Sequence, residues 1–93
     1  MKKPLVSILM NCYNGEEFLE ESINSVINQT YQNWELIFWD NKSTDNSAEI
    51  VKSFSDQRIK YFCSSEHTEL GEARKRGFSE VKGEFLAVID VDD

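Results

Sequence analysis

Short apolar runs alternate with segments of helical periodicity along the chain. Residues 5–10 form the first apolar run, which is rich in β-forming side chains, and the turn-prone stretch 11–15 ends it. Apolar side chains then recur at helical spacing over residues 18–27. Four glutamates within residues 16–21 lie near the start of this segment, where a helix dipole favours negative charge. The pattern predicts a strand followed by an amphipathic helix.

A second unit of the same kind follows. Residues 34–39 predict a strand that ends at Asp40, and residues 43–46 offer several candidates for a helix N-cap. Glu49 stands three positions after Asn46, which is the spacing of a capping box. One face of the predicted second helix carries three apolar residues, Ala48, Val51 and Phe54.

The pattern continues to the end of the chain. Residues 59–63 predict a short third strand, and the polar loop 64–69 leads into a third helix. One face of that helix carries Leu70, Ala73, Gly77 and Val81. After a turn at Gly83, residues 85–89 form an unbroken apolar run, which suits a strand buried on both faces. The order β-α-β-α-β-α-β predicts an α/β fold, a Rossmann-like parallel sheet with helices on both faces.

Length and charge narrow the range of functions. The 93 residues correspond to one domain, residues 1–93, since domains usually run from about 50 to 250 residues. Ten basic and 17 acidic residues give a net charge of −7. A nucleic-acid-binding protein carries a basic face, and anionic membranes attract basic segments, so neither is expected as a partner. The 40% hydrophobic content is enough to build a core.

The sequence carries no sign of export or of a disulfide framework. The apolar stretch at residues 5–10 is too short for a signal peptide or a membrane span. Cys12 and Cys63 are too few and too far apart for a disulfide framework or a Cys-x-x-Cys metal site. We therefore expect a cytoplasmic location.

Polar residues follow each predicted strand. In open parallel sheets, ligands bind beyond the carboxyl ends of the strands, so these residues are expected to converge on one edge of the sheet. They are Asn11, Tyr13 and Asn14 after the first strand, residues 40–43 after the second, residues 64–66 after the third, and Asp90, Asp92 and Asp93 after the fourth.

Asp90 and Asp92 follow a buried strand with one residue between them. Two such carboxylates could hold a hard divalent cation together with substrate phosphates. Alternatively, they merely solvate a strand end. A third interpretation comes from phosphatases of the haloacid-dehalogenase type, which also place Asp-x-Asp after an apolar strand. In those enzymes, however, the motif usually opens the fold.

Other polar residues each allow a functional and a structural interpretation. Tyr13 could stack on a nucleobase or pack over the sheet edge. Arg74 could pair with a phosphate, although the run 74–76 also has the character of a charged surface. His67, between two glutamates, is interpreted as a solvated loop residue rather than a metal ligand.

Five segments in order carry a resemblance to a known family. They are residues 4–14, 22–31, 35–45, 71–77 and 83–85, the last leading into the Asp-x-Asp strand. Residues 35–45, for instance, are similar to the pattern Glu-x-Ile-x-Val-Asp-Asp-Gly-Ser-Thr-Asp. Together the segments resemble the nucleotide-binding half of family 2 glycosyltransferases, which have the GT-A fold. That resemblance implies the strand order 3-2-1-4.

The resemblance also implies site residues. Contacts to a nucleotide-diphosphate sugar donor are expected from Asn11, Tyr13, Asn14, Asp40, Asn41, Arg74 and Asp90. Tyr13 would stack near the base, and Asp40 with Asn41 would meet the uracil or ribose. Asp92, together with Asp90, would coordinate Mn²⁺ or Mg²⁺ bridging the diphosphate. A cation is chemically apt, because a diphosphate entering a protein of charge −7 needs local positive charge.

The chain departs from the family pattern at three positions. Asn11 replaces a proline, which costs little. Asn41 replaces the second aspartate of a pair, so an altered base preference is expected. Lys42 replaces a glycine, and because only glycine visits positive φ freely, we expect the backbone of this loop to be shifted.

The function implied is the donor-binding part of an inverting, metal-dependent glycosyltransferase of polysaccharide biosynthesis. It would act with a UDP-sugar and a saccharide or lipid-linked acceptor. In the family, the acceptor-binding half and the acidic general base lie downstream of Asp-x-Asp. We therefore expect an incomplete domain of a longer parent protein, in which the catalytic residue is unknown. The chain alone is expected to transfer no sugar. Membrane association of the parent protein is left open. The alternatives are a phosphatase-like enzyme and a non-catalytic interaction domain.

Two structural expectations follow from the strand order. Strands one and three would lie two strand spacings apart, about 9–10 Å. This is too far for a disulfide between Cys12 and Cys63. The fourth strand would form a bare apolar edge, and such edges pair between chains, so a homodimer through this edge is expected.

Overall fold

The computed structural model describes residues 3–91, which form seven alternating elements. They are β1 (Val6–Cys12), α1 (Glu16–Ile27), β2 (Trp34–Asp40), α2 (Ser47–Lys52), β3 (Ile59–Cys63), α3 (Leu70–Phe78) and β4 (Phe85–Val91). The predicted element order is confirmed. The first strand extends further than expected, because Asn11 and Cys12 continue its pairing with both neighbouring strands instead of starting the turn.

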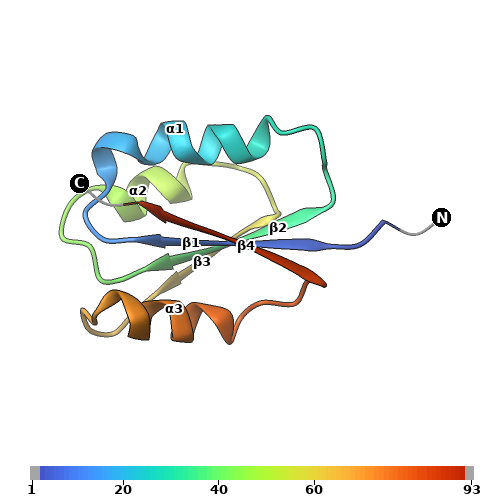
Figure 1. Ribbon diagram of the computed structural model, residues 1–93. Coiled ribbons are helices and arrows are strands. Elements are labelled where there is room, and N and C mark those ends of the chain that lie inside the picture. The colour runs from blue at the N-terminus through green and yellow to red at the C-terminus, as the bar shows by residue number, and fades with distance from the viewer. Residues whose placement is uncertain (1–2, 92–93) are drawn as a thin grey trace.

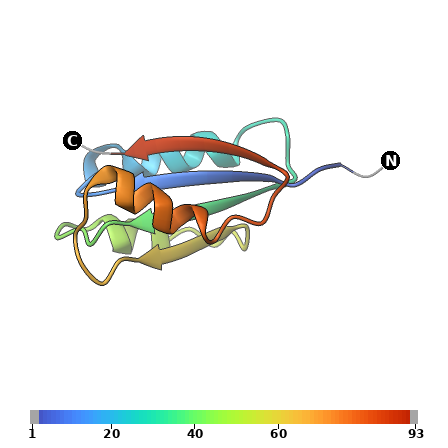
Figure 2. The same ribbon diagram turned by 60° about the horizontal axis from the view of Figure 1, so that its bottom comes forward.

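The four strands form one parallel sheet in the order β3-β2-β1-β4, as expected from the resemblance. Their register brings the carboxyl ends to one level: Cys12 is paired with Asp40 on one side and with Val91 on the other, and Asp40 is paired with Cys63. Helices α1 and α2 cover one face of the sheet and α3 covers the other (Figures 1 and 2). The prediction of helices on both faces is therefore confirmed.

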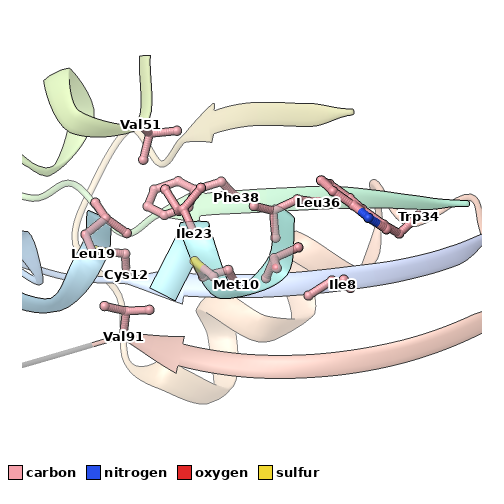
Figure 3. Close-up of a cluster of buried hydrophobic side chains, with 11 residues drawn as sticks. Ile8, Met10, Cys12, Leu19, Ile23, Trp34, Leu36, Phe38, Val51 and Val91 are labelled. Carbon is pink, nitrogen blue, oxygen red and sulfur yellow. The ribbon is translucent and has the colours of Figure 1, made fainter. Parts of the chain in front are cut away.

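The main core lies between the sheet and the α1–α2 layer. Alternate side chains of β1 and β2 point into it, because successive residues of a strand face opposite sides of the sheet. They meet apolar residues of the two helices (Figure 3). The buried members are Ile8, Met10, Cys12, Leu19, Ile23, Val26, Trp34, Leu36, Phe38, Val51 and Val91. Phe54, predicted to lie on α2, follows the end of that helix and packs against the same core.

Helix α3 approaches β1 closely on the opposite face. Ala73 is fully buried, and a Cβ atom added at Gly77 would lie 2.5 Å from a methyl carbon of Leu9. The two small residues therefore permit the close packing. The helix ends at Phe78, so Val81, which was predicted to lie on its face, belongs to the following turn.

The prediction that the fourth strand is buried on both faces is wrong. Within residues 3–91 β4 is an edge strand, paired with β1 alone, which confirms the bare edge expected from the strand order. Phe85, Leu86 and Val88 are 59%, 45% and 42% exposed. An apolar run specifies that side chains can be buried but not what covers them. Pairing between two copies through this edge stays a prediction.

A buried polar cluster joins the start of the sheet to the turn before β4. The hydroxyl of Ser7 donates to Glu35 Oε2 (2.5 Å) and accepts from the backbone N–H of Gly83 (2.7 Å). The same carboxylate oxygen accepts the backbone N–H of Lys82 at 2.9 Å. Lys60 Nζ lies 3.8 Å from the other oxygen of Glu35. These contacts fix where the chain enters β4.

Both cysteines are free thiols, as expected, since β2 separates the strands that carry them. Burial is the main cause that raises the pKa of the Cys12 thiol, so this group stays neutral near pH 7. Over residues 3–91, no helix has the length and apolar character needed to cross a membrane.

The first turns of α1 and α2 cap one another through side chains. Asp45 accepts the backbone N–H of Ser47 (2.9 Å) and that of Glu16 (3.1 Å) through its two carboxylate oxygens. Glu16 in return accepts the backbone N–H of Asn46 at 3.3 Å. Asn46 occupies the N-cap position of α2 but makes no side-chain capping bond, so the predicted capping box is wrong. Contacts between the two helices replace it.

We expect Asp45→Ala to lower the free energy of unfolding by about 1 kcal/mol at pH 7, because two helix N–H groups lose their acceptor. Asn46→Ala is the matched control and should change little. Partial burial alone would raise the pKa of Asp45, but hydrogen bonds from Ser47 and Glu16 outweigh it and lower the pKa.

Because the folded-state pKa is lowered, this stabilisation is present above about pH 4 and lost as the pH falls through the lowered value. The difference between the wild-type chain and Asp45→Ala should therefore shrink in acid. Urea unfolding followed by circular dichroism from pH 7 to acid pH measures both effects. A loss in Asn46→Ala as large as that in Asp45→Ala would contradict the cross-capping arrangement.

Candidate functional site

A pocket of about 190 Å³ lies at the carboxyl edge of the sheet. The ends of β1 and β4, the loop after β2, and the loop before α3 with its first turns form its walls. Its polar lining consists of Asn11, Tyr13, Asn41, His67, Thr68, Glu69 and Asp90. Its apolar lining consists of Cys12, Leu70, Ala73 and Val91. The edge predicted to bind a ligand is thus the one that carries this pocket.

Four of the predicted site residues line the pocket together: Asn11, Tyr13, Asn41 and Asp90. Asn11 is 3% exposed, and its Nδ2 donates to Asp90 Oδ1 at 3.4 Å. Its Oδ1 is buried without a hydrogen-bond partner among the described residues. A buried acceptor without a partner is costly, so this oxygen is suited to receive a donor group from a ligand.

Arg74 lies outside the pocket lining and forms an ion pair with Asp90, joining Nη2 to Oδ2. Both side chains are partly exposed, at 39% and 31%. The guanidinium Nε is buried and has no partner among the described residues. The Arg74 guanidinium thus lies beside the pocket, and its positive charge balances the negative charge of the Asp90 carboxylate.

Asp40 and Asn14 are at the expected strand ends, but neither lines the pocket. Asp40 is 1% exposed, and its oxygens accept the Ser43 backbone N–H (2.8 Å) and the Tyr61 hydroxyl (2.7 Å). Burial and this carboxylate together raise the pKa of Tyr61. The side-chain oxygen of Asn14 accepts the backbone N–H of Thr44 at 2.7 Å. Both side chains hold the loop after β2, and a direct ligand contact would require these bonds to break.

The expectation that Lys42 shifts its loop is wrong. Lys42 itself adopts the left-handed backbone conformation, with φ of 59°. Its ammonium group donates to the backbone oxygen of Ser65 at 3.3 Å. The loop therefore keeps a conformation that favours glycine, and the lysine bears the steric cost.

Three polar residues of the pocket lining were not identified as binding residues from the sequence: His67, Thr68 and Glu69. His67 is exposed, which agrees with its interpretation as a solvated residue. Its ring nevertheless packs against Tyr13, with 4.1 Å between the ring centroids and an interplanar angle of 47°. Sequence spacing gives no signal for such a contact, because it joins loops more than 50 positions apart.

The described residues supply one of the two predicted metal ligands. Asp90 offers hard carboxylate oxygens at the pocket, the kind that Mg²⁺ and Mn²⁺ prefer. Asp92, the other predicted ligand, lies outside the described residues. Within residues 3–91 no three His, Cys, Asp or Glu side chains are grouped so as to hold a metal ion. Asp90 is therefore chemically able to supply one ligand to such a cation.

Comparison with known proteins agrees with the resemblance found in the sequence. The sequence pattern described as glycosyl transferase family 2 matches residues 7–93 of the chain. A relative from Escherichia coli is UDP-Glc:alpha-D-GlcNAc-diphosphoundecaprenol beta-1,3-glucosyltransferase WfgD. It is 43% identical over 89 residues, which cover 96% of this chain and 35% of that protein. The chain spans about a third of the length of the curated relatives it matches.

Solved structures show the same fold. The mannosyltransferase PcManGT from Pyrobaculum calidifontis, in complex with GDP-Man and Mn²⁺, matches with a TM-score of 0.87 at 21% identity. The match covers 96% of this chain and 28% of that one. S. aureus TarS 1-349, in complex with UDP-GlcNAc, matches with a TM-score of 0.86 at 25% identity. That match covers 91% of this chain and 26% of the other. The four-stranded sheet of this chain is thus the GT-A arrangement.

We expect Lys42→Gly to raise the free energy of unfolding by about 0.5–1 kcal/mol relative to Lys42→Ala. Glycine adopts positive φ without the steric cost that any Cβ atom carries, although it also gains entropy in the unfolded chain. The two variants lose the same contact to Ser65, so their difference isolates the backbone effect. Urea unfolding at pH 7 measures it. Equal stability of the two variants would contradict the interpretation.

Proposed function

The chain belongs to glycosyl transferase family 2, and on that premise we propose that its pocket binds a nucleotide-diphosphate sugar, with a UDP-sugar as the donor. The observation that carries the proposal is the meeting of Asn11, Tyr13, Asn41 and Asp90 around one pocket at the carboxyl edge of a parallel sheet. Phosphatase-like chemistry would leave the aromatic and amide part of this lining without a role.

The preference for uridine is supported by two relatives. The name of the 43% identical E. coli protein specifies UDP-Glc, and S. aureus TarS 1-349 was solved with UDP-GlcNAc. An exposed Tyr13 ring provides a stacking surface for a base. The Oδ1 of Asn11, which has no partner within residues 3–91, can accept a hydrogen bond from an N–H or hydroxyl group of the nucleotide.

The Arg74–Asp90 pair suits a ligand that carries phosphate. Without a ligand, the two opposite charges satisfy one another at the rim of the pocket. A diphosphate could attract the Arg74 guanidinium, which pairs well with phosphate oxygens. The Asp90 carboxylate would then be available for a divalent cation, together with Asp92. Bound Mn²⁺ or Mg²⁺ would neutralise the diphosphate and favour its departure from the sugar.

The acceptor and the stereochemistry are further parts of the proposal. We take the acceptor to be a hydroxyl of a saccharide or lipid-linked saccharide, in a pathway of polysaccharide biosynthesis; the E. coli relative is named for a diphosphoundecaprenol-linked acceptor. Inverting transfer requires a general base that removes the proton of the attacking hydroxyl. We propose that this base lies in the part of the relatives' length that the present chain does not span.

We expect calorimetric titration to detect UDP binding that strengthens when Mn²⁺ is added. Tyr13→Ala should weaken it by about fivefold or more, because base stacking contributes about 1–3 kcal/mol and 1.4 kcal/mol corresponds to tenfold. Asp90→Asn and Asp92→Ala should each reduce the gain from Mn²⁺. Phe78→Ala, which truncates an exposed aromatic side chain outside the pocket, is the matched control and should bind as the wild-type chain does.

Two results would contradict the proposal. The first is the absence of any heat with UDP, with and without Mn²⁺, from a chain that is folded by circular dichroism. The second is binding that Tyr13→Ala and Phe78→Ala weaken equally, which would place the nucleotide elsewhere. GDP, titrated in parallel, tests the preference for uridine and should bind more weakly than UDP.

Transfer itself gives a separate prediction. The 93-residue chain, incubated with a radiolabelled UDP-sugar, Mn²⁺ and saccharide acceptors, should form no labelled product, because the general base is not expected within it. Turnover by this chain would show that its own residues complete the active site.

A further inference from the structure

The side chain of Asn41, directly after β2, is hydrogen-bonded to the loop between β3 and α3. Asn41 Nδ2 donates to the backbone oxygen of Thr68 at 2.6 Å, and Asn41 Oδ1 accepts the backbone N–H of Thr68 at 3.0 Å. The Thr68 hydroxyl donates to the same Oδ1 at 3.1 Å. Asn41 is 6% exposed, so these bonds form where water has little access.

A carboxamide is suited to this contact and a carboxylate is not. The amide carries a donor and an acceptor side by side, and it therefore pairs with both the N–H and the C=O of one residue, as a neighbouring strand would. An aspartate would keep the acceptor but lose the donor. Its second oxygen would then face the Thr68 carbonyl oxygen, and this half-buried carbonyl would lose the partner that Asn41 provides.

The same tie sets the position of an aromatic side chain. His67 precedes Thr68, and its Nδ1 lies 3.2 Å from the backbone oxygen of Asn41, the distance of a hydrogen bond when that nitrogen carries the proton. The His67 ring packs on Tyr13. Asn41 therefore positions His67 in two ways. Its backbone oxygen contacts the His67 ring, and its side chain holds the neighbouring residue Thr68.

We infer that Asn41 is a positioning residue, which fixes the loop 64–69 so that His67 and Tyr13 form one aromatic wall of the pocket before a ligand enters. In the proposed function, on which this role rests, that wall receives the base of the nucleotide. Asn41 acts through Thr68 and His67, since its own amide is already paired. The Asn41 side chain thus stabilises the pocket wall before a ligand binds, instead of contacting the ligand directly.

The arrangement can be tested without any ligand, because the chain contains a single histidine. At about pH 8.5, where an ordinary imidazole is neutral, the Tyr13 ring current should displace the proton resonances of His67. Tyr13→Leu supplies the undisplaced reference. Asn41→Asp should move the His67 resonances toward that reference. Asn24→Asp adds the same charge on the exposed surface of α1 and should leave them unchanged.

A variant of Thr68 distinguishes the backbone hydrogen bonds to Asn41 from the hydroxyl hydrogen bond. Thr68→Ala keeps both backbone partners of Asn41 and should leave the His67 resonances near their wild-type positions. In the wild-type chain, the Thr68 amide should exchange with solvent at least about tenfold more slowly than a free amide, although it lies in a loop. This measurement needs no variant, so it decides the question even if Asn41→Asp does not fold.

Nucleotide binding completes the test. Asn41→Asp, folded by circular dichroism, should bind UDP about tenfold more weakly than the wild-type chain, equivalent to about 1.4 kcal/mol, whereas Asn24→Asp should bind equally well. Unchanged His67 resonances in Asn41→Asp, free exchange of the Thr68 amide, or equal UDP affinity of Asn41→Asp and the wild-type chain would each overturn the inference. If the wild-type chain bound no nucleotide, the proposed function would fail, and the resonance and exchange measurements would still decide whether Asn41 positions the loop.

Discussion

Parallel pairing of the central strand β1 with β2 and β4 is the constraint on which the other features depend. It brings Cys12, Asp40 and Val91 to one level, and β3 extends the alignment through Cys63. Parallel strands all end at the same edge, so the loops that follow them must share that edge. The pocket exists because four chain segments that are distant in sequence leave the sheet side by side.

Side-chain amides and carboxylates then hold these loops in place. Asn14 braces the loop after β2, Asp45 caps the first turns of two helices, and Asn41 binds the loop before α3. The contacts of Asn14 and Asn41 join one loop to another, and those of Asp45 join the first turns of two helices. Polar residues at strand ends can therefore either contact a ligand or hold the neighbouring loops in place. In this chain Asn14 and Asn41 hold loops in place.

Charge is distributed in keeping with a donor that carries phosphate. The chain has a net charge of −7, and of the two acidic residues that line the pocket, Glu69 and Asp90, Asp90 is paired with Arg74. In the proposed function this pair would lower the cost of admitting an anion, since Arg74 would turn to the phosphate while Asp90 would accept a cation. Family membership and the position of the pocket at this edge of the sheet are the two observations on which the proposed donor site rests.

The amino-acid pattern was sufficient for the element order and for the carboxyl edge as the site, because hydrophobic periodicity and βαβ handedness are local properties of the chain. The family resemblance supplied the strand order and marked Asn11, Tyr13, Asn41 and Asp90. The apolar run alone predicted burial of β4 on both faces, whereas the strand order implied by the resemblance predicted the exposed edge that the structure has. Contacts between different loops could not be predicted from the sequence. They include the pairing of Asn41 with Thr68 and the packing of His67 on Tyr13. The capping by Asp45, in place of the expected Asn46 capping box, was not predicted either. These features depend on which segments meet in space, and only the packing of the sheet and helices decides that.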